Sequence, residues 1–185
     1  MAIVINGTGT VAGLSVGGIN DGAIANADLA DSTKPIFSSY AIITNELSAG
    51  TQGGASTANS WETYALNTEL ADPDSIVSIS SNKFTLAAGS YLIKWLCKLM
   101  NGERSSSRLY DVTNTAVSQY SMTQYGWYTS TFTPGFARVT PSGSTEYRLE
   151  YYVDGAQATY GLGMDAPDDQ GVTINAVVEI YKEAS

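Results

Sequence analysis

Short segments rich in β-branched and aromatic residues recur from residue 36 to the end of the chain, with no convincing helix between them. Turn residues separate the segments, as at 72–74 and 141–143. We expect strands at 39–44, 62–66, 75–80, 83–86, 91–100, 108–112, 117–122, 128–139, 146–153 and 172–181. About ten short strands in roughly 150 residues predict an all-β protein, a β-sandwich of jelly-roll type.

The alternation within three segments predicts which faces are buried. In 146–153 the odd positions are apolar and the even ones mostly charged, which is typical of a strand with one wet face. In 91–100 the odd face is wholly apolar, whereas the even face mixes Leu and Lys. A second apolar face needs a cover, and a neighbouring subunit is one candidate. The segment 172–181 behaves similarly, with Ile174, Ala176, Val178 and Ile180 on one face and Asn175, Val177, Glu179 and Tyr181 on the other.

Residues 1–36 form a different kind of segment, which is rich in Gly, Ala, Asn and Asp and has no aromatic residue. Such a segment cannot build its own core, so it is either flexible or ordered by a partner. Its low charge and its recurrent Gly-Thr units favour an ordered structure between chains. A short helix at 20–31 is a further expectation. The N-terminus does not read as a signal peptide.

Composition excludes several classes of function. The 185 residues include no His and one Cys, so a His-based active site or a Cys-based zinc site is ruled out. The net charge of −9 speaks against nucleic acid and against an anionic membrane as partners. No segment approaches the ~20 apolar residues of a membrane helix. We expect no enzyme and no cofactor; the best enzymatic alternative is a paired-carboxylate glycosidase.

Four motifs in order carry a resemblance to a known family. The segment 79–93 is similar to the hairpin x-F-x-L-x-x-G-x-Y-x-I of the C1q/TNF-like jelly roll found on phage and bacterial fibres. The segments 61–68, 108–113 and 177–182 resemble three further strands of that family, so the resemblance covers about 38–183. In addition, 14–24 is similar to short linking segments of phage tail-fibre proteins.

The resemblance implies a homotrimeric, non-enzymatic structural protein of the phage virion, made in the host cytoplasm and displayed on the virion surface. Residues 1–36 would be a trimerising leader that attaches to a baseplate, tail or capsid protein, and 37–185 a tail fibre knob that contacts a host glycan or protein. A capsid decoration protein or head fibre with the same knob is the alternative, and a fibre-borne polysaccharide depolymerase is less favoured. The candidates for packing in the trimer or the core are Leu92, Trp95, Leu96, Val177 and Tyr181.

Two loops hold the candidates for receptor binding. Tyr125 and Trp127 flank Gly126, and exposed Tyr and Trp stack on sugars or anchor interfaces. The long loop 154–171 adds Tyr160 and Met164, which could instead fill the axis of a trimer. We also expect Tyr128 to alternate with Phe132 in the core. The same loop contains Asp165, Asp168 and Asp169, which are weak calcium candidates beside the simpler interpretation of a solvated acidic loop.

Overall fold

The computed structural model describes residues 35–184. Almost all of the expected leader, 1–36, lies outside these residues, as does the helix expected at 20–31. The boundary near residue 36 and the attachment role of the leader therefore stay predictions.

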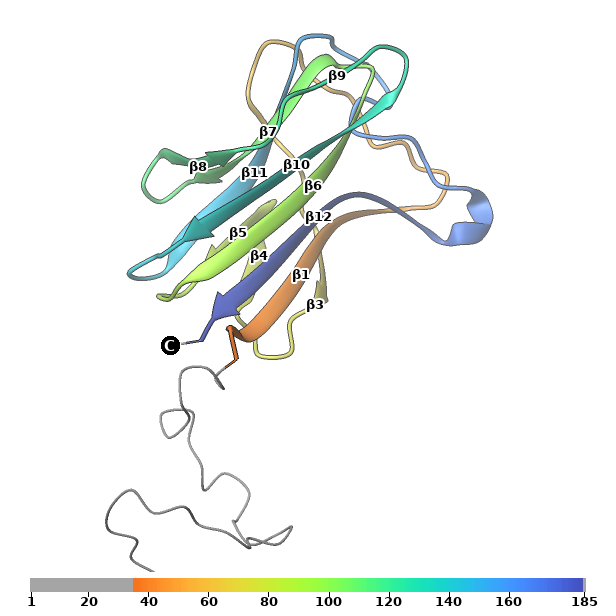
Figure 1. Cartoon of the computed structure of the whole chain (residues 1–185). Helices are drawn as coiled ribbons and strands as arrows, with labels where there is room; N and C mark the ends of the chain where they lie inside the picture. Colours follow the sequence, from red (N-terminus) through yellow and green to blue (C-terminus); the bar gives the residue numbers. More distant parts are fainter. Residues whose placement is uncertain (1–34, 185) are drawn as a thin grey trace, which may run out of the picture. The chain divides into compact units, whose positions relative to one another are not determined.

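Two antiparallel sheets make up the described part of the chain. The five-stranded sheet has the order β10 (Ser130–Val139), β6 (Tyr91–Met100), β12 (Val172–Glu183), β1 (Phe37–Ser48) and β3 (Thr68–Ala71), whose first four strands run side by side in the foreground of Figure 1. The seven-stranded sheet has the order β4 (Val77–Ser80), β5 (Lys83–Leu86), β11 (Thr145–Val153), β7 (Glu103–Asp111) and β8 (Ala116–Tyr120), while β2 (Glu62–Thr63) pairs with β11 and β9 (Gln124–Gly126) with β7. The only helical element in residues 35–184 is the short 3₁₀ turn Asp168–Gln170. The all-β prediction is confirmed.

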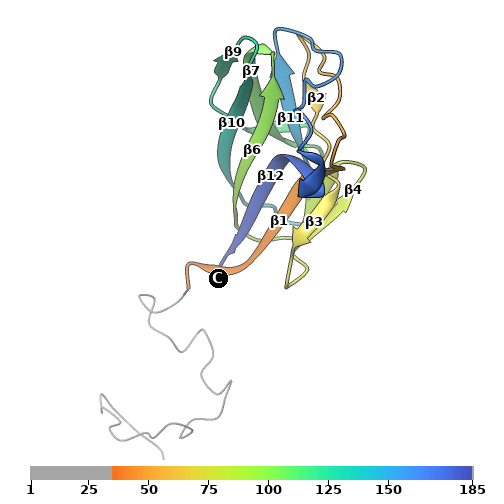
Figure 2. The ribbon, with the colours of Figure 1, turned by 90° about the vertical axis from the view of Figure 1, so that its right-hand side faces the viewer.

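The core lies between the two sheets, which Figure 2 shows from the side. The odd residues of β6 and of β11 point into it, as their alternation predicts. Trp95, on β6, is one of these buried residues. Its Nε1–H donates to Ser107 Oγ on β7 at 2.9 Å, and this bond joins the two sheets. The indole also lies against Gly135, its partner residue on β10.

The face assignment of β12 is correct from Ala176 onward and wrong before it. Ile174, expected in the core, is 42 % exposed, whereas Asn175 is buried. The cause is a bulge: Asn45 of β1 pairs with Ala176, and the next residue of β1 pairs with Ile174. The extra residue in β12 reverses the alternation at that point.

The phase expected for β10 is also wrong. Phe132 is half exposed and Tyr128 lies outside the core at 77 % exposure, with a positive φ of 53°. The residues of β10 that face the core are small or short: Thr131, Thr133, Gly135, Ala137 and Val139. They leave the space that the Trp95 indole occupies.

Candidate functional site

The outer face of the five-stranded sheet gathers exposed apolar side chains. Leu96 of β6 pairs with Val177 of β12, and Leu92 pairs with Tyr181 four residues along each strand, so four of the five packing candidates lie together on this face. The fifth, Trp95, points into the core on the other side of the sheet. We call this surface the apolar outer face; its residues are Leu92, Leu96, Phe132, Pro134, Phe136, Val177 and Tyr181.

Sequence reasoning predicted a strand at 128–139 but not that its Phe side chains face outward, where β10 contributes most to the apolar outer face. Phe132 and Phe136 of β10 are 50 % and 64 % exposed, and Phe136 pairs with Lys94 of β6. Phe136 lines a groove of about 450 Å³, with Leu96, Pro134 and Val177 also in its walls. The sequence of 128–139 contained a usable signal. The small residues at 135 and 137 show that the odd positions are the ones that can face a buried Trp.

Two ion pairs lie on the same face. Lys94 Nζ lies 3.6 Å from Glu179 Oε2, and 5.5 Å from the centroid of the Tyr181 ring. Arg138 donates two hydrogen bonds of 2.7 Å to the carboxylate of Glu183. These bonds raise the pKa of Arg138 and lower the pKa of Glu183. Neither pair therefore contributes a net charge to this part of the surface.

The two loops with receptor candidates meet at one end of β6. The amide of Met100 donates to Gly161 O at 2.9 Å and that of Asn101 to Thr129 O at 3.1 Å, so each loop is tied to the end of the strand. Tyr125 is 68 % and Trp127 53 % exposed.

The other two candidates lie in the loop after β11. Met164 is exposed, whereas Tyr160 is half-buried in a bridge to Gly54. The Trp127 ring contacts Tyr128 edge-on, with 5.5 Å between centroids. Binding by these residues stays a prediction.

Two of the three carboxylates of the acidic loop are among the described side chains. Asp165 Oδ1 accepts a hydrogen bond from Gln52 Nε2, and Asp169 is exposed, while the side chain of Asp168 lies outside what the structure describes. Among the side chains that the structure describes in residues 35–184, no three from His, Cys, Asp or Glu come close enough to hold a metal ion.

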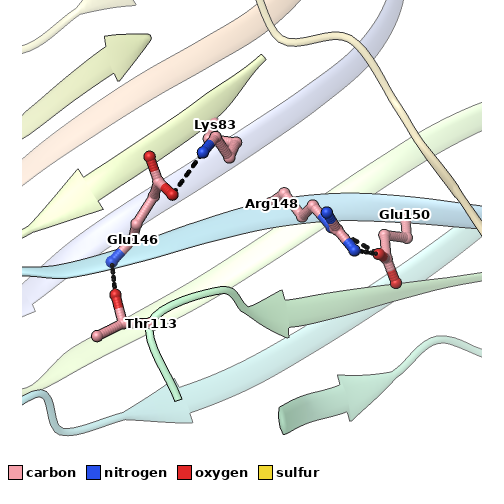
Figure 3. A network of polar contacts seen from close by, with 5 residues as sticks. All are labelled: Lys83, Thr113, Glu146, Arg148 and Glu150. Carbon is pink, nitrogen blue, oxygen red and sulfur yellow. Dashed lines mark hydrogen bonds and ion pairs between the residues drawn. The ribbon is translucent and has the colours of Figure 1, made fainter. Parts of the chain in front are cut away.

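A buried carboxylate on the seven-stranded sheet contradicts the expected wet face of β11. Glu150 is 1 % exposed and accepts hydrogen bonds from the guanidinium groups of Arg108 and Arg148. Figure 3 shows Arg148 directed at Glu150 along β11, and Lys83 at Glu146. The sequence shows each charge but not that strands β7 and β11 bring them together.

The lone thiol has no nucleophilic character. Cys97 is fully buried on β6, and this burial raises its pKa to about 12. It is therefore a packing residue, because the thiolate is the reactive form.

Comparison with known proteins identifies the fold. The globular domain of zebrafish complement 1qA superposes with a TM-score of 0.52 at 15 % identity, over 77 % of this chain and 94 % of that one. The Eiger TNF of S. frugiperda gives 0.54 at 9 % identity, over 82 % and 95 %. Murine APRIL at pH 5.0 gives 0.51 at 7 % identity, over 78 % and 98 %. The chain therefore has the C1q/TNF-like jelly-roll fold.

No model of a known protein family matches the sequence, and neither does any curated protein. In the described residues, no helix has the length and apolar character needed to cross a membrane.

Proposed function

We propose that this protein is a non-enzymatic structural protein of a phage virion, a homotrimeric tail fibre knob that contacts the host surface. The observation that carries the proposal is the apolar outer face of the five-stranded sheet. Contiguous exposed apolar surface on a small domain marks a site of association. Two Phe side chains, Phe132 and Phe136, are exposed on it, and Phe136 lines a groove that a partner can fill.

A second and third copy of this chain are the partners that fit best. The net charge of −9 makes copies repel each other on average. On the apolar outer face, however, the acidic side chains Glu179 and Glu183 are each paired with a cation. Copies that meet through this face therefore avoid most of the repulsion and bury Phe side chains. The C1q/TNF-like fold supports three copies around an axis.

The virion placement is supported by the motifs of the chain. The segment 14–24 resembles linking segments of phage tail fibres, and the motifs of 61–182 resemble knobs of the same class. Host contact would involve the loop residues Tyr125, Trp127, Tyr160 and Met164. Three weak sites on one trimer give avidity for a repetitive host glycan.

The mass of the full-length chain in solution tests the assembly. Light scattering after size exclusion should give three times 19.5 kDa. Phe136→Asp places a charge in the face and should shift the mass toward 19.5 kDa. Leu70→Asp is a matched control, because Leu70 is also an exposed apolar residue but lies on the edge strand β3. A monomeric wild-type chain, or a trimer unaffected by Phe136→Asp, would contradict the proposal.

Labelling of virions with an antibody against residues 37–185 tests the placement. Label at the tail tip supports the tail fibre, whereas label on the capsid supports the decoration protein. Unlabelled particles would refute a virion role. A reducing-end assay on host polysaccharide tests the absence of catalysis, and release of sugar would refute it.

A further inference from the structure

The outer face of the seven-stranded sheet has a hollow that none of the loop candidates lines. Its volume is about 270 Å³. Tyr152 of β11 forms one wall, and Arg104 and Asp154 form another. The full lining is Arg104, Ser105, Ser106, Thr123, Tyr152 and Asp154. The hollow is thus polar on most sides and aromatic on one.

The polar wall offers donors and acceptors side by side. Arg104 Nε–H donates to Asp154 Oδ2, and the Arg104 side chain is 73 % exposed, so its remaining N–H groups reach solvent. Ser106 and Thr123 add hydroxyl groups, each of which donates and accepts. Neighbouring donors and acceptors of this kind match the vicinal hydroxyl groups of a sugar ring.

The aromatic wall is part of a cluster of three tilted rings. The Tyr152 ring centroid lies 5.4 Å from that of Trp61, and the Tyr120 centroid lies 5.8 Å from that of Trp61. Tyr120 is more than half exposed. Tyr and Trp present a large, rigid apolar area with a polar tip, which is the surface that the C–H face of a pyranose can cover.

A buried ion pair holds the Trp61 ring of this cluster in place. The Arg108 guanidinium lies 4.2 Å from the centroid of the Trp61 ring and is held by an ion pair with the buried carboxylate of Glu150. The Tyr152 hydroxyl reaches Asn59 Oδ1 at 3.4 Å. Trp61 and Tyr152 therefore need little ordering when a ligand arrives, which lowers the cost of binding. Arg108 and Glu150 are positioning residues, because they act through Trp61.

The aromatic cluster lies outside the core of the sandwich. Residues 149, 151 and 153 of β11 face the core, so Glu150 and Tyr152 lie on the opposite side of the sheet. The outer faces of two packed sheets point in opposite directions. A ligand in the hollow and copies packed on the apolar outer face can therefore be bound at the same time.

We propose that the hollow binds a pyranose unit of a saccharide, with its C–H face on Tyr152 and its hydroxyl groups on Arg104, Asp154 and Thr123. That this saccharide belongs to the host surface rests on the function proposed above. The binding site itself does not rest on it.

The test uses the full-length chain and ligand-observed saturation-transfer NMR with the methyl glycosides of glucose, galactose, mannose and N-acetylglucosamine. We expect at least one to bind with a dissociation constant near 1 mM, as one small shallow site allows. Saturation should be strongest on the C–H protons of one ring face. Tyr152→Ala should weaken binding by about tenfold or more, because the stacking wall is lost.

Two surface variants keep the test decisive if Tyr152→Ala unfolds. Thr123→Ala should weaken binding by about threefold, and Arg104→Gln by about tenfold. Thr85→Ala is the matched control on the same sheet and should bind as the wild type does. No saturation transfer at about 10 mM ligand, or equal transfer in the hollow variants, would overturn the proposal.

Adsorption to host cells separates this inference from the proposed function. If the wild-type trimer adsorbs and the hollow variants adsorb equally well without binding any glycoside, the hollow binds a sugar but is not the site of host adsorption, and the proposed function stands. If the wild type neither trimerises nor adsorbs, the proposed function fails, while the glycoside titration still decides whether the hollow binds a sugar.

Discussion

Replacing Gly135 with Ala tests the contact that sets the phase of β10. Gly135 pairs with Trp95 across β10 and β6. A Cβ atom at residue 135 would lie 2.1 Å from Cζ2 and 2.2 Å from Cε2 of the indole, far inside contact distance. Because the ring is part of the packed core, it has to move toward the seven-stranded sheet.

The cost has two parts. Overpacking of a well-filled core destabilises by about 1–3 kcal/mol. Displacing the indole also lengthens the bond from Trp95 Nε1 to Ser107 Oγ, and a buried donor left unpaired costs about 1–3 kcal/mol. We therefore expect a loss of about 3 kcal/mol, or a fall in Tm of roughly 6–12 °C for a domain of this size.

The assay is urea unfolding at one fixed protein concentration, followed by near-ultraviolet circular dichroism, which reports on the environment of tryptophan. Gly143→Ala is the control, because a Cβ at residue 143 meets no atom within 4 Å. Trp95→Leu should remove most of the penalty of Gly135→Ala in a double-mutant cycle. If Gly135→Ala is as stable as Gly143→Ala, the steric argument is refuted.

Three further changes probe other buried groups. Glu150→Gln leaves Arg108 and Arg148 without their carboxylate, so urea unfolding should show a loss of about 2–4 kcal/mol, whereas Lys83→Gln, in the more exposed pair with Glu146, should cost less than about 1 kcal/mol. A similar loss in both variants would contradict the role of burial. Tyr64→Phe removes a hydroxyl that lies 2.8–3.1 Å from the carbonyl oxygens of Lys98, Leu162 and Asn175, and should lower the free energy of unfolding by about 1–3 kcal/mol; no change would mean that water replaces it. Burial raises the pKa of the Cys97 thiol from 9.0 to about 12, so above pH 9 the unfolded chain loses a proton that the folded chain keeps. Stability should fall by about 1.4 kcal/mol per pH unit from this group, about 2 kcal/mol by pH 10.5, and Cys97→Ala should remove that part of the slope. Tyr147, whose pKa burial likewise raises to about 12, continues the fall in both proteins, so the difference between the two slopes is the quantity to measure.

The local sequence pattern predicts the bounds and the buried face of a strand correctly where pairing with its neighbours introduces no bulge. The bounds of β5 and β6 are as expected, because Gly89 and its neighbours separate two cleanly alternating segments. The short strands β3 and β9 were missed, since four and three residues give no usable alternation. In β12 the alternation itself misleads, because the bulge opposite Asn45 depends on the register with β1.

The candidate sites show the same limit. That the even face of β6 needs a cover could be read from Leu92 and Leu96. That Phe132 and Phe136 join them could not, because 128–139 has apolar residues in both phases and only the indole of Trp95 decides between them. Glu150 looks solvated in the sequence, since Arg108, which pairs with it and lies over the Trp61 ring, comes from a distant segment.

The two outer faces of the sandwich carry different chemistry, and this difference bears on how the protein would act. The apolar outer face holds large rings and internally paired charges, which suits a permanent contact between copies. The opposite face holds a small open hollow beside the aromatic cluster of Trp61, Tyr120 and Tyr152, which suits a weak contact with a polar ligand. Under the proposed function, a single hollow of about 270 Å³ that is open to solvent would not by itself hold a virion on a cell. Three hollows on one rigid assembly would, because the second and third binding events become intramolecular. Assembly through the apolar outer face is therefore what would make the hollow useful.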